Sequence, residues 1–167
     1  MIKTLGWVLC CAGLMACDYT VPLVETPEVA LDGAWVGLWG RAREKGEPER
    51  LLVLPLNPRE YLVVFPAGSP DAMYARACRA KAEGLELIQL NWVGTAKGAV
   101  PEDHRTYQYA LCAREGDTLS VRLINSQTVP REVATREAWL RALAEKKDHP
   151  ELFRETMRFQ RESDGKP

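Results

Sequence analysis

Residues 60–65 read EYLVVF, so that Tyr61, Val63 and Phe65 fall on one side of an extended chain. Alternation with a period of two is typical of a β-strand that buries one of its faces. Asn57-Pro58 precedes this run, and a segment rich in Pro, Gly and Ser follows it. Such residues favour turns. The stretch therefore predicts a strand over 60–65 that is bounded by a turn at each end.

Similar runs lie on both sides of this strand. The sequence predicts further strands over 34–41, 50–56, 72–81, 85–93, 104–114 and 118–125. Most are joined by short turns, such as Glu83-Gly84 and Glu115-Gly116-Asp117. The pattern then changes, since 131–147 is rich in helix formers and spaces Val133, Leu140 and Leu143 along one helical face. A second helix start is predicted at 148–151, and a returning strand at 156–160.

Eight strands are enough to close a barrel, and closure removes the exposed edges of an open sheet. We therefore expect a mainly β fold: an antiparallel up-and-down barrel of about eight strands, with a helical segment before the last strand. The alternative is an α+β fold, in which a curved antiparallel sheet packs on helices. Gly33-Ala34-Trp35 also resembles the Gly-x-Trp signature of lipocalin-like barrels. In that family the helix follows the eighth strand, whereas here it precedes the last one.

The start of the chain carries a different signal. A single charge at Lys3 precedes an apolar run over 5–15, which is too short to span a bilayer and is typical of a secretion signal. Leu14-Met15-Ala16-Cys17 then resembles the lipobox of bacterial lipoprotein precursors. The resemblance implies a signal peptide over 1–16, which is removed, and a diacylglycerol on the sulfur of Cys17. It also implies a lipid-anchored (palmitate-bearing) protein of the cell envelope, facing the periplasm or the exterior.

The rest of the mature chain divides simply. Residues 17–30 include Pro22 and Pro27, and we expect them to tether the domain to the lipid. A single domain is expected over 31–162, with a disordered tail over 163–167. Asp18 resembles the residue that retains some lipoproteins in the inner membrane. The formal net charge is −1 and no basic stripe is visible, so nucleic acid is not an expected partner.

Chemical signals are few. No cofactor, metal or catalytic motif is recognisable, although His104 lies beside Glu102 and Asp103 and could form a His–carboxylate cluster. Cys78 and Cys112 lie on predicted strands separated by one other. Strand spacing then places them nearly 10 Å apart, so we expect two free thiols.

The conspicuous aromatic residues suggest where a ligand could bind. If the barrel is hollow, its lining is expected to include Trp35, Trp39, Tyr107 and Tyr109, although aromatic side chains more often form a core. The inward rows mix large and small residues. This favours a filled interior, with recognition by the loops over 94–103 and 43–49.

These observations predict a membrane-anchored envelope lipoprotein that acts as a non-catalytic binding or interaction module. Its partner would be an envelope protein or a small apolar ligand. The alternative is an envelope enzyme of hydrolase type, whose site the sequence does not reveal.

Overall fold

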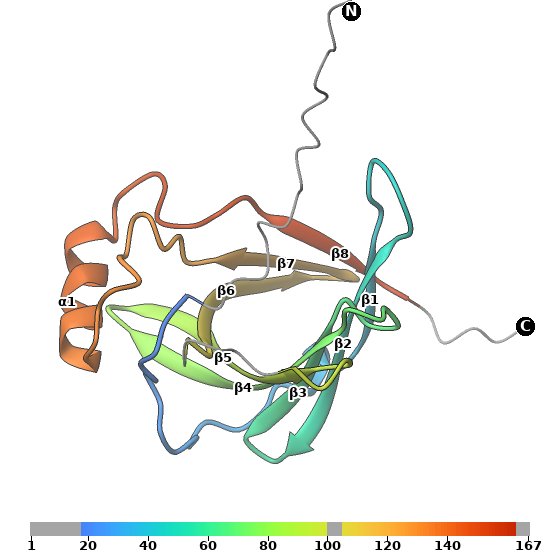
Figure 1. Ribbon diagram of the computed structural model, residues 1–167, viewed down its shortest axis with the longest axis horizontal. Coiled ribbons are helices and arrows are strands. Elements are labelled where there is room, and N and C mark those ends of the chain that lie inside the picture. The colour runs from blue at the N-terminus through green and yellow to red at the C-terminus, as the bar shows by residue number, and fades with distance from the viewer. Residues whose placement is uncertain (1–17, 100–104, 163–167) are drawn as a thin grey trace, which may run out of the picture.

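In the computed structural model, which describes residues 18–99 and 105–162, eight antiparallel strands close into a barrel (Figure 1). Each strand pairs with its neighbours in chain order, and β1 closes the barrel against β8 through the pairs Trp39–Arg161 and Gly40–Gln160. The strands are β1 (Gly37–Arg41), β2 (Glu49–Asn57), β3 (Glu60–Phe65), β4 (Met73–Ala82), β5 (Leu85–Thr95), β6 (Tyr107–Glu115), β7 (Thr118–Leu123) and β8 (Met157–Arg161).

The predicted fold class is confirmed, including the helix α1 (Arg136–Lys146) that precedes the last strand. The α+β alternative is not adopted, because the sheet closes on itself. The strand predicted over 60–65 has the bounds expected of it. No helix in the described part of the chain is long and apolar enough to cross a membrane.

One face of every strand contributes to a buried interior. The register pairs Tyr61 with Ala77, Ala77 with Leu90, and Ala110 with Leu123, so these side chains share the inner face. The interior cluster consists of Trp39, Val53, Tyr61, Val63, Met73, Ala75, Ala77, Ile88, Leu90, Trp92, Ala110, Leu119, Val121, Leu123 and Phe159. Large and small residues interdigitate in it, as the predicted inward rows require.

A second buried cluster lies on the outer face of β4–β6, where α1 covers the barrel (Figure 1). Thr135 caps the N-terminus of helix α1, and its hydroxyl accepts a hydrogen bond from the Ala138 amide at 3.2 Å. The helix buries Trp139 and Leu143 completely, and the two side chains lie about one helical turn apart on the same face. The second helix start predicted at 148–151 is wrong: the chain there makes a turn that brings Leu152 into this cluster.

The segment expected to be a tether instead packs on the barrel over residues 18–24. Tyr19 is completely buried, pairs with Tyr107 at the edge of β6, and donates its hydroxyl to the Val129 carbonyl at 2.8 Å. Val21 and Leu23 are also buried. Tyr19, Val21 and Leu23 alternate with Thr20 and Pro22, so the segment carries a short period-two signal, which the prediction of a tether overlooked.

Gly33-Ala34-Trp35 does not begin a strand. Gly33–Trp35 forms a 3₁₀ turn, in which the Asp32 carboxylate accepts from the Ala34 amide at 2.9 Å, and β1 starts only at Gly37. The same spacing recurs in Gly37-Leu38-Trp39, and this copy begins the strand. The prediction of a strand from residue 34 was therefore too early, because the Asp32 cap favours a turn over extended chain.

Candidate binding pocket on the outer face

The four aromatic residues expected to line a hollow barrel do not lie together around one cavity. Trp39 is completely buried in the interior cluster. Trp35 is partly buried against the same cluster, and its ring stacks on Tyr61 with centroids 6.2 Å apart. The Tyr61 hydroxyl both accepts from the Asp32 amide and donates to the Asp32 carbonyl. These two tryptophans thus belong to a packed core and its cover.

Tyr107 and Tyr109 lie on the outer face of β6, which corrects their expected place in the lumen. Gln108 and Ala110 are the residues whose side chains point inward: Gln108 accepts from the Trp92 indole at 2.9 Å. Tyr109 instead packs against Trp139, with centroids 4.6 Å apart. Alternation predicts that Tyr107 and Tyr109 share a face of β6. Because both faces of β6 are covered, alternation does not predict which face points into the barrel.

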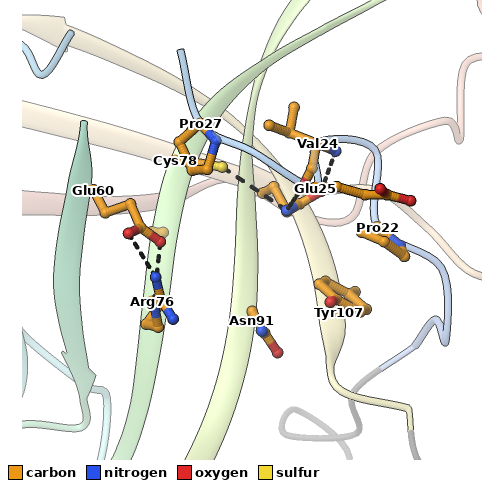
Figure 2. Close-up of a pocket in the computed structure, with 11 residues that line it drawn as sticks. Pro22, Val24, Glu25, Pro27, Glu60, Arg76, Cys78, Asn91 and Tyr107 are labelled. Atoms are coloured by element: carbon orange, nitrogen blue, oxygen red, sulfur yellow. Dashed lines mark hydrogen bonds and ion pairs between the residues drawn. The ribbon is translucent and has the colours of Figure 1, made fainter. Parts of the chain in front are cut away.

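A pocket of about 240 Å³ lies between the N-terminal segment and the outer face of β3–β6 (Figure 2). Residues of the N-terminal segment form its roof, and residues of four strands form its floor. The lining residues are Pro22, Val24, Glu25, Pro27, Glu60, Arg76, Ala77, Cys78, Gln89, Asn91 and Tyr107.

Gln89 holds the roof in place. Its side-chain oxygen accepts from the amides of Leu23 and Val24, at 2.6 and 2.9 Å, and its nitrogen donates to the Val24 carbonyl at 2.8 Å. The Gln89 side chain therefore substitutes for a neighbouring strand, since it satisfies backbone groups that would otherwise be buried without partners.

Glu60 and Arg76 form a two-pronged ion pair at one wall. The Arg76 Nε donates to Glu60 at 3.0 Å and one terminal nitrogen donates at 2.6 Å. The hydrogen bond from Arg76, assisted by one from Asn57, holds the pKa of Glu60 below its usual value even though burial opposes this. The carboxylate is thus ionised at neutral pH and its charge is balanced, so this wall is polar with little net charge.

Asn91 and Tyr107 supply the uncommitted polar groups of the pocket. Their side chains make no hydrogen bond with the other nine residues of the wall, all of which the structure describes (Figure 2). An amide can donate and accept, and so can a phenol. Burial raises the pKa of Tyr107, so its hydroxyl stays protonated at neutral pH. A ligand in the pocket would meet these two groups and the outer nitrogen of Arg76.

Cys78 lies at the floor of the pocket but is not activated. Burial, with a smaller effect from Glu60, raises the pKa of its thiol to about 11, which leaves very little nucleophilic thiolate at neutral pH. The prediction of two free cysteines is confirmed. Cys78 contacts Gln89 on the outer face, whereas Cys112 packs against the interior cluster, so the wall of the barrel separates them.

Two predicted sites lie outside the described residues: the lipidation site Cys17 and the cluster of Glu102, Asp103 and His104. Among the residues that the structure does describe, no three His, Cys, Asp or Glu side chains come together as metal ligands would. The pocket itself was missed, because its residues are scattered along the sequence. The available signal was the pair of polar residues, Gln89 and Asn91, on one face of the largely apolar strand β5.

The chain was compared with protein-family models, curated proteins and solved structures, and none of the three comparisons found a match.

Proposed function

We propose that this protein is a lipid-anchored, non-catalytic binding module of the cell envelope, and that the outer pocket is its binding site. The observation that carries the proposal is the pair of uncommitted polar side chains, Asn91 and Tyr107, in a pocket whose roof begins at Pro22, five residues after the predicted lipidation site. Polar groups placed in a concave site are typical of ligand binding.

The pocket favours a small, uncharged, polar ligand. Its volume of about 240 Å³ is below the range usual for drug-sized ligands. The charges of Glu60 and Arg76 balance each other, and the one further charge in the lining, Glu25, is exposed to solvent, so a strongly charged ligand gains little there. A hydroxylated ring suits the site, because hydroxyl groups match donors and acceptors alike while the ring contacts Tyr107, Pro22 and Pro27.

A binding role is favoured over catalysis by the state of the reactive groups. The Cys78 thiol is held protonated, and Glu60 is occupied by Arg76 and Asn57. Neither is poised as a nucleophile or a general base. The interior cluster also argues against an apolar ligand carried inside the barrel, since buried side chains from all eight strands occupy that space.

Binding can be tested on residues 18–167 by saturation-transfer NMR with a panel of neutral monosaccharides and amides. We expect transfer to at least one hydroxylated compound, and its loss in Asn91→Ala and in Tyr107→Phe. Gln160→Ala, at an exposed position on β8, is the matched control and should leave the signal intact. Equal signals in all variants, or none in the wild type, would exclude the pocket as the site.

The anchor is tested separately in cells that produce the full chain. We expect radiolabelled palmitate to enter the protein and Cys17→Ala to abolish the labelling and leave an unprocessed precursor. A processed, lipid-free wild-type protein, identified by its intact mass, would refute the anchor without affecting the pocket.

A further inference from the structure

The first described residues after the predicted lipidation site, Asp18 and Tyr19, are held firmly on the barrel. The amides of Asp18 and Tyr19 both donate to the Tyr107 carbonyl, at 3.2 and 3.0 Å. The Asp18 carboxylate is 1% exposed and pairs with Arg154 at 2.7 Å. Because adjacent Cα atoms are about 3.8 Å apart, a lipid on Cys17 would hold the start of β6 close to the bilayer surface.

Exposed apolar side chains lie close to this point. Tyr107 pairs with Asn91 of β5, and Val93 follows two residues later, at a bulge beside Tyr74 of β4. Val93 is 48% exposed and Tyr74 is 36% exposed, among the highest values for large apolar residues in the described chain. From strand spacing and rise, Val93 lies about 12 Å from Asp18.

The apolar surface continues across the next two strands. Tyr74 pairs with Val64, and Val64 pairs with Leu52, so all three occupy one row on the outer face. Leu54, which is 39% exposed, is the next outward residue of β2. We call Leu52, Leu54, Tyr74 and Val93 the rim patch; Val64, in the same row, is only 6% exposed. Neither α1 nor the N-terminal segment covers the rim patch, since the outer cluster on which both pack contains none of these residues.

We propose that the rim patch rests on the lipid bilayer beside the anchor. The proposal rests on the lipid anchor of the proposed function, and it adds the orientation of the barrel on the membrane. A bilayer surface is the favoured occupant because the attachment point lies at the margin of the patch and allows the barrel little freedom to turn it away. Tyr74 suits the headgroup region, where its ring is buried and its hydroxyl stays hydrated. Lys97, which forms an ion pair with Asp71, has a long side chain whose ammonium group can reach lipid phosphates.

The test measures solvent access at single cysteines in the full chain, produced in bacteria and kept in isolated membranes. The background carries Cys78→Ala and Cys112→Ala, and the probes are Tyr74→Cys and Val93→Cys. The matched control is Arg158→Cys, exposed on β8 at the opposite wall of the barrel. Each variant reacts with a membrane-impermeant maleimide, and its rate is compared with that of the same substitution in lipid-free residues 18–167, which contain all eight strands.

We expect the Tyr74 and Val93 probes to react roughly fivefold or more slowly in membranes than in the lipid-free protein, because the interface excludes a charged reagent. The Arg158 probe should react at equal rates in both. Equal rates at all three positions in a protein that carries palmitate would overturn the proposed orientation and leave the anchor intact. A chain without palmitate, released from the membrane, would refute both. If the Tyr74 and Val93 probes also react slowly in the lipid-free protein, and sedimentation shows a dimer, then a second copy of the chain covers the rim patch and the proposal is overturned.

Discussion

The guanidinium of Arg161 lies over the indole ring of Trp39, 4.1 Å from its centroid. Its two terminal nitrogens donate to the carbonyls of Val36 and Ala34, at 2.8 and 2.6 Å. One side chain of the last strand thus joins the first strand to the 3₁₀ turn that precedes it. This contact complements the short backbone pairing of β1 with β8.

We expect Arg161→Ala to lower the free energy of unfolding by roughly 2–4 kcal/mol, because the cation–π contact and two charge-assisted hydrogen bonds are lost. Arg161→Lys should recover only part of this, since an ammonium group cannot form the same planar fork. Arg158→Ala, on the same strand but exposed, is the control and should unfold like the wild type. Urea denaturation gives all three values. An unchanged midpoint for Arg161→Ala would mean that backbone pairing alone closes the barrel.

Gly37 is required where the chain enters β1. Its φ is +146°, and a Cβ at this position would lie 2.5 Å from an Arg161 nitrogen. Gly37→Ala should therefore destabilise the domain by roughly 1–3 kcal/mol, through backbone strain and displacement of Arg161. Gly33→Ala is the matched control, because a Cβ there would meet no atom within 4 Å beyond its chain neighbours, and its φ is ordinary. Thermal unfolding of the two variants should separate them clearly, and equal midpoints would contradict the steric argument.

The buried Asp18–Arg154 pair fixes the N-terminal segment. Asp18→Ala should cost about 3 kcal/mol, because it leaves the positive charge of Arg154 without its partner in a largely buried setting. It should also release residues 18–24, which proteolysis would detect as early cleavage near the N-terminus. Asp148→Ala removes an exposed carboxylate and should do neither. If the Asp18 variant keeps wild-type stability and protease resistance, the hydrophobic contacts of Tyr19 alone hold the segment.

Thiol chemistry should report the burial of both cysteines. Burial raises the pKa of Cys78 to about 11 and that of Cys112 to about 12. At pH 8 the folded protein should therefore react with iodoacetamide far more slowly than a free thiol, whereas the denatured, unreduced protein should show both thiols. Mass spectrometry counts the adducts. Rapid labelling of Cys78 in the folded protein would show that the N-terminal roof opens readily.

The same shifts predict loss of stability in alkali. The folded state holds protons on groups whose pKa values are raised, so their contribution is complete below the unfolded thiol pKa of 9.0. It is lost as the pH rises toward the folded values of about 11 and 12. Burial also raises the pKa of Tyr19 and Tyr109, which adds to the effect at the upper end of this range. Urea midpoints should fall steadily above pH 9, and a flat profile to pH 11 would contradict the burial of these groups.

Periodicity in the sequence was sufficient to predict the strands and their order. Alternation in β3 and the Gly-containing turns after β4 and β6 mark short antiparallel connections, and eight such strands close without leaving an edge. The helix before the last strand was predicted from composition and spacing. These are local properties, decided by residues a few positions apart, so the sequence alone determined them.

The tertiary structure decided which face of each strand is inside. In β6 both faces are covered, so a period of two cannot distinguish Tyr109 from Ala110 as the interior residue. The choice depends on α1 and on residues 18–24, which lie far away in the sequence and offer the larger apolar surface to the tyrosine. The pocket has the same origin. Glu60, Arg76, Asn91 and Tyr107 come from four strands and meet only because strand register places them in adjacent rows, beneath a segment that lies far from them in the sequence.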